Sequence, residues 1–330
     1  MGNDEKTPPV AEKTIVCDDL LISSAFVYEL DETLAHYDLR GESSRKIGYA
    51  LAENYDRRIF RAISKAARQP SPVSMTNFVE PGGSVLKVGT DTSTDKKDAY
   101  DDDKLVTAFY DAAAILDEKG VSGDGRVAVL NPRQYYSLIQ SVSGNGLINR
   151  DVQGTALQSG NGIIEIAGIK IYKSMNIPFF GKYGTSADAL RAGYDSNDNA
   201  GSFVGATMED MDQAASGGTP AGGQKTTNNY GTATKFEHSC GLIFQKEAAG
   251  VVEAIGPSVQ TTSGDISVVY QGDVILGRLA MGADFLNPAC AVELVAGINT
   301  AHGTTGWGGS GTVSTSISNA AFDSSGNAGG

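Results

Sequence analysis

Histidine, cysteine and tryptophan are scarce in this chain of 330 residues, which contains three histidines, three cysteines and one tryptophan. Cys17, Cys240 and Cys290 lie far apart and none belongs to a C-x-x-C pair, so neither a disulfide framework nor a structural zinc site is indicated. His238 lies near Cys240, but two ligands do not make a four-ligand zinc site. Reduced, buried thiols are the simpler interpretation, and they fit synthesis in a cytoplasm.

Long apolar runs and an excess of basic residues are also missing. Leu20–Ile22 is among the longest clean apolar stretches, far short of the roughly 20 residues that span a bilayer. The opening residues Met1–Glu5 do not resemble a signal peptide, so export and membrane anchoring are not expected. The net charge of −13 argues against a dedicated nucleic-acid binder. It is compatible with a container whose inner wall repels packed DNA, which counting the charges on that wall would test.

Motifs that carry chemistry are equally few. His36 and Asp38 could form half of an acid–base couple, but no third partner and no G-x-S-x-G motif accompanies them, so a structural histidine is favoured. The triplet Asp101–Asp103 is better explained as a helix start than as a metal site. The segment from Asp195 resembles a calcium loop, but Ala206 stands where a bidentate glutamate belongs. We therefore expect no enzyme activity, no cofactor and no metal.

The longest helix pattern covers residues 43–68. Ser43 or Ser44 can serve as the N-cap, and Pro70 bars continuation. About 25 residues make a rod of roughly 37 Å. Apolar residues recur every fourth position along it, at Ile47, Leu51, Tyr55, Ile59 and Ile63.

The other face of this rod is rich in arginine. A charged face is usually only a solvated one, but arginine is also favoured at interfaces that recruit carboxylates. The basic face, which includes Arg57, Arg58 and Arg61, is therefore either solvated or part of an interface.

Shorter elements follow the same logic. A helix from Asp101 to Lys119 begins with acidic residues and ends before Gly120. A third helix begins with Asn131 as N-cap and Pro132 at the first helical position. We expect strands at residues 14–28, 126–130, 162–172 (two strands joined at Ala167-Gly168), 241–255, 267–270, 274–279 and 291–295, a short helix at 30–37, strands and turns at 72–100, and loops at 181–235.

Four segments, in this order, resemble the major capsid proteins of T7-like short-tailed bacteriophages, which have the HK97-like fold, and the likeness extends to marine cyanophages. They are spread over residues 14–294, and their shared order and spacing carry the likeness. They are residues 14–54 (beginning TIVCDDLLISSAFVY), 126–140 (RVAVLNPRQYYSLIQ), 146–151 (GLINRD) with 163–178 (IIEIAGIKIYKSMNIP), and 273–294 (DVILGRLAMGADFLNPACAVEL).

The resemblance implies an α+β fold with a peripheral domain, an axial domain, a long spine helix and an extended loop, the E-loop. Family members carry an N-terminal arm and an outgoing half of the E-loop ahead of the point where this sequence begins, so we expect both to be missing here. The implied division is a partial E-loop at 1–22, the peripheral domain at 23–100 with the spine helix at 43–68, the axial domain at 101–265 with a glycine-rich insertion at 181–235, returning peripheral strands at 266–300, and a flexible tail at 301–330.

The resemblance also implies a structural protein of the virion that assembles in the host cytoplasm into hexamers and pentamers of an icosahedral head. A scaffolding protein, a portal at one vertex and packaged DNA, held without sequence-specific contacts, are the implied partners; no membrane is involved. Intersubunit contacts are expected at Arg57, Arg58, Arg61 and Lys65 on the spine and at Asp4, Glu5 and Lys6 in the E-loop.

Two other classes of structural protein stay open at this point. Glycine, threonine and asparagine richness with acidity is typical of a secreted adhesin or surface-layer protein, although three helix patterns and the missing signal peptide count against it. A shell-forming nanocompartment protein of the same fold differs only in its cargo.

Overall fold

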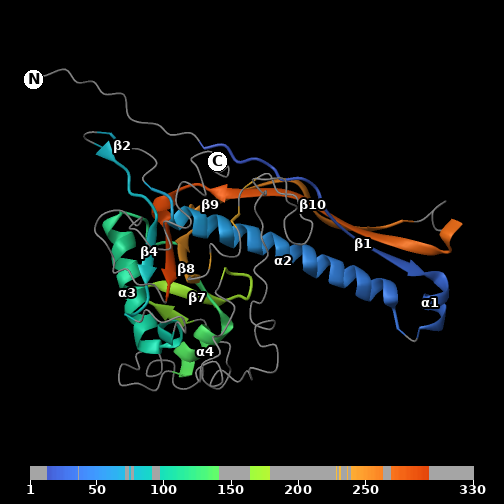
Figure 1. Cartoon of the computed structure of the whole chain (residues 1–330), viewed down its shortest axis with the longest axis horizontal. Coiled ribbons are helices and arrows are strands. Elements are labelled where there is room, and N and C mark those ends of the chain that lie inside the picture. Colours follow the sequence, from blue (N-terminus) through green and yellow to red (C-terminus); the bar gives the residue numbers. More distant parts are fainter. Residues whose placement is uncertain are drawn as a thin grey trace, which may run out of the picture.

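The computed structural model describes residues 13–35, 37–70, 74–75, 78–90, 97–140, 164–178, 228, 230–231, 236, 239–262 and 269–296. These residues form a long arm attached to a more compact body (Figure 1). The arm combines one helix with a three-stranded sheet, and the body is built on a six-stranded sheet.

Helix α2, Leu39–Ala67, is the axis of the arm and is 29 residues long. It begins four residues earlier than the predicted range, because the Asp38 carboxylate accepts a hydrogen bond of 2.8 Å from the Gly41 amide and caps the first turn. Its apolar stripe follows the predicted spacing, and Ile47, Leu51 and Ile63 are buried. The predicted spine helix is therefore confirmed as an element, and its N-cap is corrected.

The arm sheet has the antiparallel strand order β1–β10–β9. Its strands are β1 (Leu21–Tyr28), β10 (Gly272–Phe285) and β9 (Ala249–Thr261). Alternate residues point to α2, where Val27, Ile275 and Leu279 join Ile47 in a small core. The short helix α1, Glu29–Leu34, connects β1 to α2 at the far end of the arm (Figure 1).

The body sheet has the mixed strand order β4–β11–β8–β5–β7–β6. The pairs β4–β11 and β5–β7 are parallel, and the other neighbours are antiparallel. In that order the strands are Ser84–Lys87, Ala291–Val295, Ser239–Gln245, Arg126–Leu130, Ile169–Lys173 and Ile164–Ile166. The β6–β7 hairpin turns at Ala167 and Gly168, both with positive φ, as predicted.

Helices α3, Asp102–Glu118, and α4, Pro132–Gln140, pack against this sheet (Figure 1). The predicted N-cap of α4 is confirmed, because Asn131 accepts from the Arg133 amide. Helix α3 begins at the predicted acidic triplet, but Asp101, predicted as its first residue, is the N-cap and accepts from the Lys104 amide. The remaining short elements are β2 (Ser74–Met75), β3 (Phe78–Val79), η1 (Lys97–Tyr100) and η3 (Pro288–Cys290).

Strand pairing differs from the predicted division of the chain at three strands. β4 and β11 belong to the body sheet although they lie in the segments predicted as peripheral, 23–100 and 266–300. β9 belongs to the arm sheet although most of it lies in the predicted strand 241–255 of the axial domain. The physical reason for the placement of β9 is that it follows β8 closely, so the chain passes directly from the body sheet into the arm sheet between these two strands. The tail 301–330 and most of 181–235 lie outside the described residues.

Candidate assembly surface

Four cationic side chains follow one face of the second half of α2, and we call them the cation row: Arg58, Arg61, Lys65 and Arg68. Their spacing of three and four residues places them on one side of the helix. The side predicted to face a neighbour is in fact turned into the subunit, where all four residues are buried.

Each member of the row contacts a different part of the chain. Arg58 Nη1 donates to Asp18 Oδ2 at 3.0 Å, and only 1% of the residue surface is exposed. Arg61 Nη1 donates to the Gly231 carbonyl at 2.9 Å. These two contacts bring the segment before β1 and the end of the glycine-rich insertion onto the helix.

The other two cations join the helix to β10 and to the body sheet. Lys65 Nζ lies 2.8 Å from Asp284 Oδ1, whose second oxygen lies 2.6 Å from Lys13 Nζ. Arg68 forms a two-pronged ion pair with Glu293 on β11, and both residues are fully buried. Removing one partner of such a pair leaves a buried, unpaired charge, which costs about 3–5 kcal/mol.

The predicted contact of this face with a neighbouring subunit stays a prediction. Within the chain, the cations of the row already have partners. Because both side chains are buried and bonded within the chain, charge reversal at Arg58 or Arg61 is also expected to destabilise the folded subunit itself. Arg57 is half-exposed and pairs with Glu53 at 2.6 Å. Asp4, Glu5 and Lys6 lie outside the described residues.

The open face of the arm sheet is the surface that the sequence analysis missed. Strand β1 is apolar on both faces: Leu21, Ala25 and Val27 point to α2, whereas the alternating residues point away from it. Those outward residues are Ile22, Phe26 and Tyr28, with exposed fractions of 54%, 38% and 56%. A strand that is apolar on both sides is typical of a strand covered on both sides. That pattern in LISSAFVY could have identified the surface.

The open face continues onto the central strand. Val274 pairs with Phe26 and Leu276 pairs with Ser24, so both side chains lie on the same side of the sheet as Phe26. Phe26 and Tyr28 stack edge to face with ring centroids 4.7 Å apart. The side of the sheet opposite α2 thus has an apolar area around Phe26 and Tyr28, with Ser24 and Arg278 on the same side.

The apolar surface extends to the tip of the arm. Leu30 and Leu34 lie one helical turn apart on α1 and are 68% and 70% exposed. Tyr37 and Tyr270 are also strongly exposed. Exposed apolar residues are unremarkable singly, but several of them at one end of the arm make it a candidate interaction surface.

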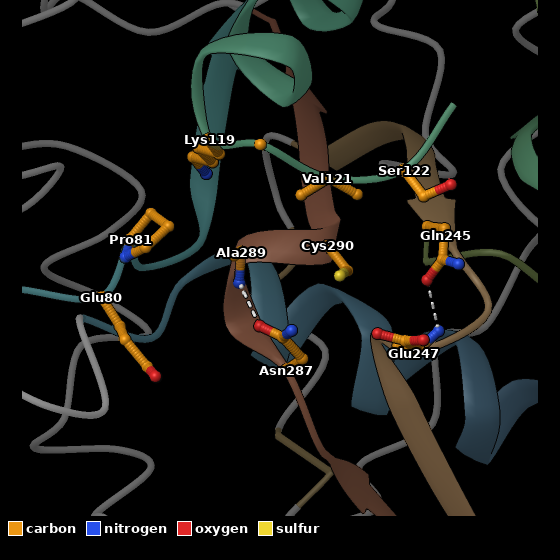
Figure 2. Close-up of a pocket in the computed structure, with 11 residues that line it drawn as sticks. Glu80, Pro81, Lys119, Val121, Ser122, Gln245, Glu247, Asn287, Ala289 and Cys290 are labelled. Carbon is orange, nitrogen blue, oxygen red and sulfur yellow. Dashed lines mark hydrogen bonds between the residues drawn. The ribbon is translucent and has the colours of Figure 1, made fainter. Parts of the chain in front are cut away.

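A polar pocket of about 430 Å³ lies where the body meets the arm (Figure 2). Lys119, at the end of α3, donates to the Gly82 carbonyl at 2.7 Å. Burial lowers the pKa of Lys119 to about 8, and burial raises the pKa of the nearby Cys290 thiol. The pocket contains a lysine and a thiol but no hydrogen-bonded couple of base and nucleophile, so it offers no catalytic geometry.

The carboxylates and histidines that the sequence offered as metal ligands or as an acid–base couple either lie at the start of a helix or lie outside the described residues. Asp101, Asp102 and Asp103 place carboxylate oxygens within 4.8 Å of one another, but Asp101 caps α3 and pairs with Lys104 at 3.3 Å. Asp38 caps α2, while His36, His238 and the segment from Asp195 lie outside the described residues. The three cysteines form no disulfide; Cys240 and Cys290 are buried and Cys17 is partly exposed. Among the described residues, no helix combines the length and the apolar character needed to cross a membrane.

Comparison with known proteins assigns this architecture to a family. The sequence model of the Gp10A-like major capsid proteins matches residues 1–209. The chain belongs to this family. Over 139 residues it is 25% identical to the major capsid protein of Escherichia phage T7, covering 41% of this chain and 39% of that protein. The minor capsid protein of the same phage aligns equally well over 34% of its length. The chain thus spans less than half the length of the curated capsid relatives it matches.

Solved capsid structures agree with the family. The capsid structure of the cyanophage P-SCSP1u superposes with a TM-score of 0.64 at 27% identity, covering 90% of this chain and 79% of that one. The mature capsid of bacteriophage PhiM1 superposes with a TM-score of 0.54 at 14% identity, covering 89% and 79%, and this likeness concerns the fold alone. The fold is therefore the predicted α+β, HK97-like capsid fold.

Proposed function

We propose that this chain is the major subunit of an icosahedral phage head and that it assembles with copies of itself into hexamers and pentamers. The observation that carries the proposal is the open face of the arm sheet. Ile22, Phe26 and Tyr28 form an apolar surface on a chain whose family consists of major capsid proteins. One side of the sheet is covered by α2, and we expect the other to be covered by a neighbouring subunit.

The energetics fit repeated weak contacts. Burying one large apolar side chain stabilises an interface by about 1.5–3 kcal/mol before the entropy of association is subtracted. An apolar area with a few such residues gives a modest pairwise affinity. In a closed shell every subunit makes the same contacts many times, so modest contacts are sufficient.

The remaining partners follow from the same proposal. A scaffolding protein would act during assembly, a portal would occupy one vertex, and DNA would fill the interior without sequence-specific contacts. The net charge of −13 supports a wall to which packed DNA does not adhere. We propose a purely structural role, since the described residues show no catalytic arrangement. Membership in the capsid family removes the support for a secreted adhesin.

The test is a pair of substitutions on the open face. Ile22→Asp with Tyr28→Asp keeps the inward face of β1 intact and places two charges on the open face, where burial against a neighbour would cost several kcal/mol. We expect a folded subunit that no longer forms shells, measured by sedimentation and negative-stain microscopy. The matched control, Ile22→Leu with Tyr28→Phe, keeps the apolar surface and is expected to assemble.

Two outcomes contradict the proposal. Closed shells of normal size from the aspartate variant would show that the open face is not an assembly contact. A wild-type chain that stays monomeric with and without its scaffolding protein would contradict the shell role itself. Shells purified from infected cells that hold protein cargo instead of DNA would point to a nanocompartment.

A further inference from the structure

Two segments without regular secondary structure lie against the arm close to each other. The first, residues 13–20, precedes β1, and its Asp18 amide donates to the Met281 carbonyl of β10 at 3.0 Å. The Val16 carbonyl lies so close to Gly282 of β10 that a methyl group there would overlap it. The second segment contains Asn228 and residues 230–231, at the end of the predicted insertion.

A single carboxylate joins the two segments. Asp18 Oδ1 accepts hydrogen bonds from the backbone amide and the side-chain amide of Asn228, both at 2.9 Å. Asp18 Oδ2 accepts from the Tyr230 hydroxyl at 2.6 Å and from Arg58 Nη1 at 3.0 Å. Two residues of the second segment and one residue of α2 therefore converge on the same acceptor.

Two further hydrogen bonds connect Asn228 and Tyr230 to the first segment and to β10. The Asn228 side chain also donates to the Val16 carbonyl at 2.8 Å. The Tyr230 hydroxyl accepts from the Ala283 amide of β10 at 3.0 Å. Asp18, Asn228 and Tyr230 are 5%, 7% and 1% exposed, so water cannot replace a lost partner and each broken bond leaves a buried polar group unsatisfied.

We propose that Asp18, Asn228 and Tyr230 form a latch that couples the two segments, so that displacing either one from the arm releases the other. Neither segment is held by a strand ladder, and each supplies polar partners that the other needs. The coupling is a property of the subunit itself. Its consequence rests on the proposed function: a neighbouring subunit that displaces residues 13–20 from the arm would also release Asn228 and Tyr230.

The test disturbs one segment and observes the other. Gly282→Ala inserts a methyl group against the backbone of Val16 and Cys17 and changes none of the three latch residues. We expect backbone hydrogen exchange to accelerate about tenfold or more in peptides covering residues 13–20 and also in those covering 228–236, with the body sheet unchanged. The full-length chain is used throughout.

A second variant disturbs the second segment instead of the first. Tyr230→Phe keeps the buried ring but removes the hydroxyl that donates to Asp18 and accepts from Ala283. The same two peptides are expected to exchange faster. This variant keeps the proposal testable if Gly282→Ala does not fold.

Gly277→Ala is the matched control, because it also adds a methyl group to β10 but overlaps Ile47 and Leu51 of α2 instead of the first segment. It is expected to loosen the arm core without selective opening at 228–236. The latch is overturned if Gly282→Ala opens residues 13–20 while 228–236 keeps its wild-type exchange. It is equally overturned if all three variants give one common pattern of opening along the whole arm.

Discussion

Arginine and lysine on the spine illustrate how little a side chain's type says about its environment. Positions 58, 61, 65 and 68 have the spacing of one helix face, and that face could be solvated, intersubunit or internal. Their acidic partners Asp18, Asp284 and Glu293 belong to the same chain, so the face is internal. Those partners lie up to 225 residues away in the sequence, so local patterns cannot reveal the pairing.

Lys119 gives a prediction at the same scale. Burial lowers its pKa to about 8 in the folded chain, whereas an unfolded lysine titrates near 10.4. Between these values the unfolded chain binds more protons, so the contribution of Lys119 to stability rises with pH. Cys290, whose thiol pKa is raised, acts in the opposite direction in an overlapping range, and Tyr55, with its pKa raised to about 12 beside Glu253, acts only above pH 10.

A difference measurement isolates the lysine. We expect the unfolding free energy of wild type minus that of Lys119→Met to increase by about 2 kcal/mol from pH 8 to pH 10, measured by urea titration at several pH values. Lys104→Met is the control, because the pKa of Lys104 is raised beside Asp98 and its charge does not change in this window. A difference for Lys119 that is independent of pH would refute the assignment.

At the scale of elements, the start of α2 gives a test that distinguishes two candidate N-cap positions. The sequence pattern predicted Ser43 or Ser44, whereas the structure has Asp38 bonded to the Gly41 amide. We expect Asp38→Ala to lower the unfolding free energy by about 1 kcal/mol and Ser43→Ala to change it by less than about 0.5 kcal/mol. Thermal unfolding followed by circular dichroism measures both. Equal effects, or a larger effect for Ser43→Ala, would show that the cap is placed wrongly.

Elements that depend on neighbouring residues were predictable, and pairings between distant residues were not. Asn131 was identified as a cap, and Asp101–Asp103 as a helix start, because both features are decided within one turn. The β6–β7 hairpin was identified because its turn residues lie between its strands. β4 and β11 pair across some 200 residues, and no local pattern says which sheet they join. Gly41, usually a helix breaker, concealed the true start of α2.

The candidate surface was missed for a related reason. A strand that is apolar on both faces predicts two covering layers, and a single chain offers only one of them to β1. The arginines drew attention because charge stands out on a helix, yet they hold the subunit together. The residues that we propose for a neighbour are the exposed apolar ones on the opposite side of the sheet.

Considered as a whole, the molecule has a large core in the body and a small one in the arm. The body core extends over both sheet and helices, from Ile63 to Ala296. The arm core contains few buried apolar side chains, among them Ile47, Leu51 and Leu279. Local stability depends on buried contacts, so the arm of an isolated subunit is expected to open more readily than the body.

If the open face is an interface, assembly is expected to reverse this order of local stability between the arm and the body. We expect hydrogen exchange in β1, α1 and the first half of α2 to be much faster than in β5, β8 and β11 of the free subunit. In the assembled shell, protection should rise most in β1 and α1, where Ile22, Phe26, Tyr28, Leu30 and Leu34 are exposed in the single chain. The comparison needs only free subunit and particles of the same protein. Protection gained mainly in the body strands, with β1 unchanged, would show that neighbours bind elsewhere, because burial of an apolar face slows exchange in the strand that carries it.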